Sequence, residues 1–168
     1  MNLTLCPMAD ADLPVVAAWL LAPHVARWWT EDPAQEIAGY ARCIRGEEPT
    51  QARMVHLDGW AVGWCQWYRW ADYPAGEYGA GPQDVGLDYA IGEAPLVGRG
   101  VGTAMIAALV AEVGRERPHA PLLVSVDAEN TASRRVLEKN GFALVELREI
   151  PSEPEDRSAL YRLGRSIG

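Results

Sequence analysis

Three glycines at alternate positions, Gly98, Gly100 and Gly102, separate an apolar strand-like segment (Val85 to Ile91) from an apolar helix-like one (Met105 to Val113). Glycine lets the backbone approach a ligand closely and tolerates a positive φ. A helix that begins directly after such a loop offers unpaired N–H groups and the positive end of its dipole. The pattern therefore predicts a phosphate-binding loop. The plainer alternative is a glycine-rich turn that only precedes a helix.

This loop differs from two other phosphate-binding motifs. A P-loop places Lys and then Ser or Thr after its last glycine, whereas Thr103 and Ala104 follow Gly102 here. The dinucleotide motif has the spacing G-x-G-x-x-G and follows a first strand, whereas this G-x-G-x-G lies beyond the middle of the chain. Neither motif explains the loop.

Length and composition bound the class of protein. At 168 residues the chain suits one domain, and no run approaches the eighteen apolar residues of a membrane span. The N-terminus lacks a signal-peptide pattern. The cysteines are widely spaced and form no C-x-x-C, so we expect reduced thiols in the cytoplasm (Cys6, Cys43 and Cys65). The histidines have no metal-ligand spacing, and we expect no metal (His24, His56 and His119).

The charge balance favours a cationic partner. A formal net charge of −8 argues against nucleic acid, whose partners carry clustered Lys and Arg. The same charge is compatible with steering a cationic small molecule, although acidic proteins are often acidic for solubility alone.

The pattern of apolar residues predicts an α/β fold. We expect helices from Asp10 to about Leu20, from Asp32-Pro33 to Gly46, and after the glycine loop. Strands are expected at Leu3 to Cys6, Met54 to Leu57, Trp60 to Tyr68, Val85 to Gly92, Leu122 to Val126, Ala143 to Ile150 and Leu160 to Leu163. Asp58-Gly59 suits a type I′ hairpin turn. Strand pairing should be antiparallel first and locally parallel around the glycine loop.

Downstream of the loop, Asn130-Thr-Ala-Ser133 is followed by Glu138-Lys139-Asn-Gly141-Phe142. This order of motifs resembles the acetyl-CoA-binding half of the GNAT N-acetyltransferase superfamily. The resemblance implies one domain over residues 1–168, with a mixed sheet of six to seven strands and about four helices. It implies that residues 1–84 mainly bind the acceptor and residues 85–150 mainly bind acetyl-CoA. The implied cofactor contacts are Tyr89, Ala90, Ile91, Gly98, Arg99, Gly100, Val101, Gly102, Thr103, Asn130 and Ser133.

All seven tryptophans fall within the first 70 residues. Trp60, Trp64 and Trp70 share one strand parity, and Trp67 lies on the other. Most such rings belong to a core. The adjacent pair Trp28-Trp29 cannot easily bury both rings, so we expect this pair to stack on a sugar ring or a cation.

A closer resemblance is to aminoglycoside 6′-N-acetyltransferases. It rests on His24-Val-Ala-Arg-Trp28-Trp29, on Gly63-Trp-Cys-Gln66-Trp-Tyr68 and on Gly86-Leu-Asp88 before the glycine loop, and it covers about residues 10 to 142. The resemblance implies that Asp88 contacts the reacting amine. It also implies that the substrate is bound by Asp72, Asp127, Trp28, Trp29, Gln66 and Tyr68. Siderophore lysine acyltransferases are similar too, but they tend to have His where this chain has Asp88.

An amine must lose its proton before it attacks the thioester. A carboxylate with a pKa near 4 is a weak base for an amine, so we expect Asp88 mainly to bind and orient it, unless burial raises the Asp88 pKa. The resemblance to the superfamily implies that a backbone N–H within Tyr89 to Gly92 donates to the thioester oxygen. The chain also departs from the family at Leu137, where family members usually carry a Tyr proposed to protonate the departing thiolate, and at Val97, where Gln or Arg is common.

Three hypotheses remain open at this point. The chain acetylates the 6′-amine of an aminoglycoside with acetyl-CoA, giving antibiotic resistance; or it acylates another amine, such as a siderophore hydroxylysine; or it is a non-catalytic acyl-CoA-binding module. We expect no nucleic acid or membrane partner, and a monomer or homodimer.

Overall fold

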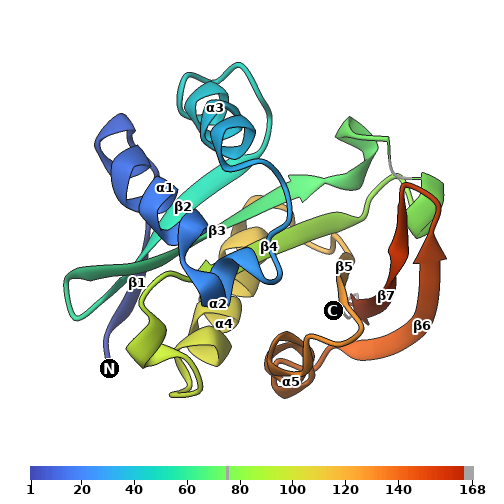
Figure 1. Cartoon of the computed structure of the whole chain (residues 1–168). Coiled ribbons are helices and arrows are strands. Elements are labelled where there is room, and N and C mark those ends of the chain that lie inside the picture. Colours follow the sequence, from blue (N-terminus) through green and yellow to red (C-terminus); the bar gives the residue numbers. More distant parts are fainter. Residues whose placement is uncertain (75, 165–168) are drawn as a thin grey trace.

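Seven strands form one mixed sheet in the order β1-β2-β3-β4-β5-β7-β6 in the computed structural model, which describes residues 1–74 and 76–164 (Figure 1). The strands are β1 (Leu3–Pro7), β2 (Gln51–Leu57), β3 (Trp60–Arg69), β4 (Val85–Ile91), β5 (Leu122–Asp127), β6 (Ala143–Ile150) and β7 (Glu153–Leu163). The α-helices are α1 (Leu13–Leu21), α2 (Pro23–Ala26), α3 (Pro33–Ile44), α4 (Val101–Glu116) and α5 (Thr131–Lys139). Short 3-10 turns are η1 (Asp10–Asp12), η2 (Trp70–Asp72), η3 (Gly76–Tyr78) and η4 (Ala94–Leu96).

Only β4 and β5 run parallel among the neighbouring strands of the described chain. This confirms the expected change from antiparallel to locally parallel pairing. The two strands meet at Val85 and Leu122, where the Val85 N–H donates to the Pro121 carbonyl at 2.9 Å. No pair is formed further along the described strands. We call the resulting opening, between Leu87–Ile91 and Val124–Asp127, the splay.

The β2–β3 hairpin has the predicted turn, because Asp58 (φ 50°) and Gly59 (φ 88°) both adopt positive φ. Its register shifts between Val55 and His56, so a bulge changes which face the following side chains occupy. Trp60 is therefore 78% exposed while Trp64 is fully buried. The expectation that these two rings share a face is wrong for this reason.

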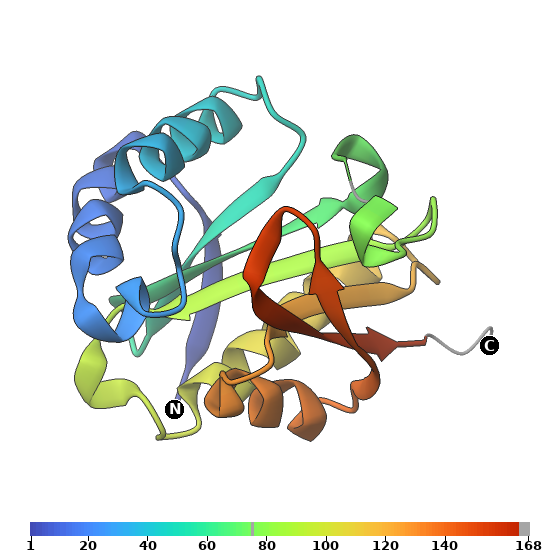
Figure 2. The same cartoon turned by 45° about the vertical axis from the view of Figure 1, so that its right-hand side comes forward.

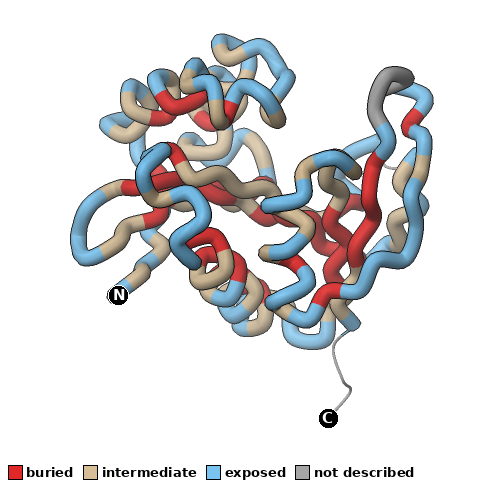
Figure 3. The backbone as a smooth tube through the Cα atoms, turned by 60° about the horizontal axis from the view of Figure 1, so that its bottom comes forward, coloured by how far each residue is buried: buried red, intermediate tan, exposed pale blue. Residues whose placement is uncertain are grey.

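Helices cover both faces of the sheet. Helices α1, α2 and α3 lie on one face and α4 lies on the other (Figure 1). Buried residues concentrate in the central strands and on the helix faces turned towards them (Figure 3). Helix α3 begins at Pro33 as predicted. Asp10 is not the cap of α1, because the turn η1 intervenes and α1 begins at Leu13.

The chain ends in the β6–β7 hairpin, which Figure 2 shows rising from the α5 side of the sheet. Strand β7 begins at Glu153, earlier than the predicted Leu160, because its first part also pairs with β6, at Glu153, Arg157 and Ser158. Arg162 of β7 donates to the buried Asp84 carboxylate at 2.9 Å and thereby ties β7 to the segment before β4. No helix of the described chain is long and apolar enough to cross a membrane.

Candidate active site

Asp88 lies near the centre of the sheet, where β4 faces β3 in register. Asp88 is the direct neighbour of Gln66, whose Nε2 donates to Asp88 Oδ2 at 2.7 Å. The Tyr68 hydroxyl also hydrogen-bonds the Asp88 carboxylate. Tyr68 pairs with Gly86, and a Cβ at Gly86 would lie 2.5 Å from the Tyr68 ring. The Gly86-Leu-Asp88 spacing therefore makes room for one of the two donors to the carboxylate.

The Asp88 pKa is raised to about 6, chiefly by burial and in addition by the nearby Glu36 carboxylate. The hydrogen bonds from Gln66 and Tyr68 act in the opposite direction, since they stabilise the charged form. Asp88 is consequently ionised at neutral pH, yet it is a better proton acceptor than an ordinary aspartate.

A cleft of about 890 Å³ opens over Asp88 between α3, the strand β3 and the end of β5. Acidic side chains outnumber basic ones in its wall. The carboxylates are Glu31, Glu36, Glu48, Asp88, Asp127 and Glu129, and the guanidinium groups are Arg27 and Arg42. The aromatic side chains in the wall are Trp28, Tyr40, Tyr68, Trp70, Tyr73 and Tyr78. Grouped carboxylates beside aromatic faces suit a cationic guest.

A smaller hollow of about 360 Å³ continues from this cleft into the splay. Both hollows are lined by Asp88, Glu36, Gln66, Trp28 and Asp127. The smaller one is also lined by Tyr89, Asn130 and Ser133, from β4 and α5. The carboxylate of Asp88 therefore stands where the two spaces meet.

Along β4, the backbone N–H and C=O groups of every second residue point towards the splay. The Trp70 N–H donates to the Asp84 carbonyl at 3.1 Å, and the Gly92 N–H donates to Val62 at 2.8 Å, so even-numbered residues of β4 face β3. Tyr89 and Ile91 consequently direct their backbone groups into the splay, whereas Ala90 does not. His24 of α2 closes part of this edge, with Nε2 2.9 Å from the Ile91 carbonyl oxygen.

The glycine loop ends in an open helix N-terminus. Gly98 (φ 77°) and Gly100 (φ 83°) are left-handed, and nothing lies within 4 Å of a Cβ placed on either. The first helical bond of α4 runs from the Ala104 N–H to the Gly100 carbonyl, so the amides of residues 101–103 precede the helical ladder. This geometry fits a pyrophosphate group.

Two loop residues have further contacts. Gly102 lets α5 approach α4, because a Cβ there would lie 3.2 Å from Val136. Arg99 turns back on its own loop, where Nε donates to the Pro95 carbonyl at 2.9 Å.

Asn130 caps helix α5, since Asn130 Oδ1 accepts from the Ser133 N–H at 3.1 Å. Its amide NH₂ is a separate donor group. The Ser133 hydroxyl lies 2.5 Å from the Tyr89 hydroxyl. Leu137, one turn further along α5, is fully buried in the core.

The two rings of the Trp28-Trp29 pair have different surroundings. Trp28 lines both hollows, and the Arg27 guanidinium lies 4.6 Å from the centre of its ring. Trp29 packs against Trp64 with ring centres 5.2 Å apart, and its Nε1 donates to Glu36 at 3.0 Å. Of the pair, Trp28 has the ring placed to meet a guest in the main cleft.

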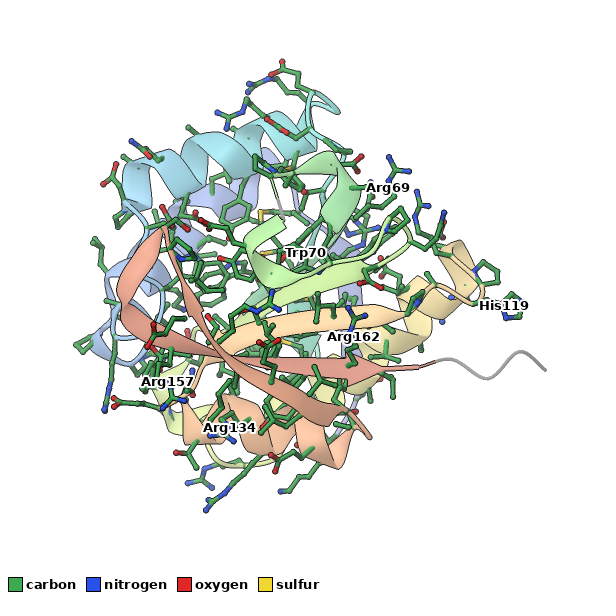
Figure 4. All side chains as sticks on the ribbon, turned by 90° about the vertical axis from the view of Figure 1, so that its right-hand side faces the viewer. Arg69, Trp70, His119, Arg134, Arg157 and Arg162 are labelled. Atoms are coloured by element: carbon green, nitrogen blue, oxygen red, sulfur yellow. The ribbon has the colours of Figure 1, made fainter. Side chains whose placement is uncertain are left out.

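The two other acidic residues predicted to bind the substrate lie in different places relative to the cleft. Asp127 lines both hollows, and its Oδ1 accepts from the Glu129 N–H at 2.8 Å. Asp72 lies outside both linings and pairs at 2.5 Å with Arg69, which is labelled in Figure 4. The structure does not bring Asp72 together with Asp88.

Sequence reasoning missed two cleft residues of α3, Glu36 and Tyr40. The apolar residues of this helix predict only the face that packs against the sheet. Glu36 and Tyr40 are four positions apart and therefore share a second face of the helix. Tyr40 accepts from Trp64 Nε1 at 2.9 Å and hydrogen-bonds Glu36. A search for polar side chains at helical spacing in the acceptor half would have found them. In the described residues, no group of three His, Cys, Asp or Glu side chains is placed to hold a metal ion.

The structure has a seven-stranded sheet, two parallel strands (β4 and β5) that separate from each other, and a glycine loop before α4. These features are typical of an acyltransferase of the GNAT type. A family model described as an acetyltransferase (GNAT) domain matches residues 8–150. The chain belongs to this family. Residues 8–150 thus form an acetyltransferase domain.

Similar proteins fall into two groups. Lysine N-acyltransferase MbtK of Mycobacterium sp. (strain MCS) is 28% identical over 160 residues, which cover 94% of this chain. This chain spans only 64% of that relative's length. Aminoglycoside N(6′)-acetyltransferase type 1 of Klebsiella pneumoniae is 25% identical over 148 residues, covering 84% of this chain and 74% of the relative. The crystal structure of aminoglycoside acetyltransferase AAC(6′)-Ib with coenzyme A and kanamycin shares the fold, with a TM-score of 0.84, 24% identity and coverage of 98% and 95% of the two chains.

Proposed function

We propose that this acetyltransferase moves the acetyl group of acetyl-CoA to a primary amine of a cationic small molecule, and that the acceptor is the 6′-amine of an aminoglycoside. The observation that carries the proposal is the position of Asp88, at the junction of an acidic cleft and the splay. The similarity to aminoglycoside acetyltransferases supports the choice of acceptor.

In this proposal the acceptor lies in the main cleft. Asp88 and Asp127 hold its ammonium groups, and Trp28 offers a ring face to a sugar or a cation. Gln66 and Tyr68 fix the Asp88 carboxylate by the bonds described above. One ammonium–carboxylate pair at about 4 Å gains roughly 4 kcal/mol at an effective dielectric of 20, so several carboxylates hold a polyamine firmly.

Acetyl-CoA lies on the other side of the junction. The amides of residues 98–103 hold its pyrophosphate, and the Asn130 amide donates to the pantetheine arm, which enters the splay. Residues 1–84 then mainly bind the acceptor, and residues 85–150 mainly bind acetyl-CoA. Asp88 serves the acceptor and Tyr89 the cofactor, because their side chains point to opposite faces of β4.

Acetyl-CoA supplies an acetyl group that is activated as a thioester. Asp88 orients the ammonium of the acceptor and takes its proton, which then passes to water. The N–H of Tyr89 or Ile91 faces the splay and stabilises the charge that develops on the thioester oxygen. Positioning by the cleft and the splay supplies much of the remaining rate.

A second candidate acceptor is a lysine-type amine. Arg27 and Arg42 lie in the wall of an otherwise acidic cleft, and a guanidinium group can hold the carboxylate of an amino acid. The similarity to MbtK supports this alternative.

Release of free thiol from acetyl-CoA, measured with kanamycin, tobramycin, lysine and hydroxylysine, tests the proposed acceptor. We expect turnover with the aminoglycosides, and resistance to these drugs in a susceptible host that expresses the protein. Turnover with the lysine-type amines alone would replace the first candidate by the second. Binding of coenzyme A without turnover of these or other amines would indicate a non-catalytic acyl-CoA-binding module.

The pH dependence of the reaction follows from Asp88. We expect kcat/KM to rise with pH through about 6, because protonated Asp88 can neither hold the ammonium nor accept its proton. Gln66→Leu removes a bond that lowers the Asp88 pKa, so the rise should move to higher pH. The measurement is kcat/KM between about pH 5 and about pH 8. Gln83→Leu, in an exposed loop, is the control and should leave the profile unchanged; an unmoved profile in Gln66→Leu would contradict the assignment.

A further inference from the structure

Two hydroxyl groups meet on the cofactor side of the splay. Tyr89 follows Asp88 on β4, so its side chain points to the opposite face of the sheet. There its ring packs against the core that contains Leu137 and Tyr161, and its hydroxyl lies 2.5 Å from Ser133 Oγ on α5. Tyr89 and Ser133 both line the smaller hollow that Asp88 also lines. The lining of this hollow thus includes both the Asp88 carboxylate and a hydroxyl pair.

A count of hydrogen-bond donors shows that this pair can bind a ligand. Each hydroxyl carries one O–H, and the bond between Tyr89 and Ser133 uses only one of the two. Whichever oxygen donates in that bond, one O–H is left over. The Ser133 N–H is already taken by Asn130 Oδ1, so the backbone does not compete for the ligand. The leftover O–H is available to an acceptor atom inside the hollow.

We propose that Tyr89 and Ser133 hold the sulfur atom of coenzyme A and donate a hydrogen bond to it as the acetyl group leaves. The inference rests on the acetyl transfer proposed above. In that step the nitrogen lone pair forms the C–N bond, and the C–S bond breaks with its electron pair passing to sulfur. The ammonium loses one proton before the attack, and the nitrogen loses a second one as the amide forms; each goes to Asp88 and then to water. The hydroxyl pair keeps its protons and stabilises the thiolate, which later takes a proton from water.

Tyr161 and Arg134, which belong to the neighbouring hydrogen-bond network, do not serve this role. Tyr161 of β7 accepts from Arg134 Nε at 2.9 Å and donates to Glu138 at 2.7 Å, and it lines neither hollow. Arg134, labelled on α5 in Figure 4, is held by that bond. Asp88 and Tyr161 are the titratable groups that act on Tyr89, and burial raises the Tyr89 pKa. Tyr89 therefore remains protonated and acts as a donor.

The test titrates the thiol of coenzyme A bound to the protein, by the ultraviolet absorbance of its thiolate. The double variant Tyr89→Phe/Ser133→Ala should raise the pKa of the bound thiol by about one to two units relative to wild type. Each single variant should raise it by less, because the remaining O–H still donates to sulfur but has lost the neighbouring hydroxyl that positions and polarises it. Tyr161→Phe is the control and should leave the bound thiol unchanged.

Each outcome decides the proposal. Ser133→Ala keeps the backbone N–H that Asn130 accepts from, and Tyr89→Phe keeps the ring in the core, so both single variants should fold and bind coenzyme A. If the double variant does not fold, an unchanged thiol pKa in both single variants overturns the inference. The titration needs no acceptor, so a failure to acetylate any amine would refute the proposed function without affecting this result.

Discussion

Replacement of Asp88 by asparagine should lower kcat/KM for the amine by about 10²- to 10⁴-fold. Asparagine keeps the shape of the side chain, but it neither attracts an ammonium group nor accepts its proton. Affinity for coenzyme A should remain at the wild-type value, because the proposed pyrophosphate contacts are made by the backbone of residues 98–103. Steady-state kinetics with acetyl-CoA and calorimetry with coenzyme A measure the two quantities separately.

The same variant should be more stable than wild type at neutral pH. The folded pKa of Asp88, about 6, lies above the value of 3.8 for a free side chain, so the folded state binds more protons between these two pH values. The free energy of unfolding therefore falls as the pH rises through this window. Asp88→Asn removes the burial of a charge and should gain about 1–3 kcal/mol at pH 7 but little near pH 4.

Denaturant unfolding at the two pH values measures this gain. Asp10→Asn is the matched control. Asp10 is exposed in the turn η1, and in the sequence it is far from the residues that line the cleft. It should change neither the rate nor the stability. Wild-type turnover in Asp88→Asn would refute the central role of this carboxylate, whatever its effect on stability.

Replacement of Gly100 by valine should weaken the binding of coenzyme A by about 10- to 100-fold. Gly100 has φ 83° at the N-cap of α4, and a β-branched residue is strained there by about 1–3 kcal/mol. The loop relieves this strain by changing its backbone, which misdirects the amides of residues 101–103. Calorimetry with coenzyme A and the KM for acetyl-CoA check the loss.

Gly46→Val separates strain from ligand binding. Gly46 has φ 73° beyond the end of α3, and, as at Gly100, nothing lies within 4 Å of an added Cβ. This control should lose a similar amount of stability but bind coenzyme A as wild type does. Equal affinities in the two variants would mean that the glycine loop does not hold the cofactor.

Local features of this fold could be predicted from the sequence. The turn at Asp58-Gly59 and the glycine loop depend on φ values that only a few residue types adopt easily, so the sequence shows them directly. Helix α3 begins at Pro33 for a similar local reason. The mixed strand pairing was predictable because a hairpin precedes the cofactor half.

Contacts between distant segments could not be predicted in the same way. The bulge beside Val55 exposes Trp60, and nothing in the alternation of residues indicates an extra residue in one strand. The action of Glu36 on Asp88 and the bond between Tyr89 and Ser133 join segments 52 and 44 positions apart. These contacts depend on how the helices pack on the sheet. The spacing of residues along one helix or strand does not determine that packing.

A crystal structure of the protein with bound coenzyme A tests the central claim most directly. We expect the pyrophosphate oxygens within hydrogen-bonding distance of the N–H groups of residues 98–103. We expect the sulfur atom inside the splay, with Asp88 on one side and Ser133 on the other. Coenzyme A bound elsewhere, with the glycine loop empty and the splay closed by side chains, would contradict the account.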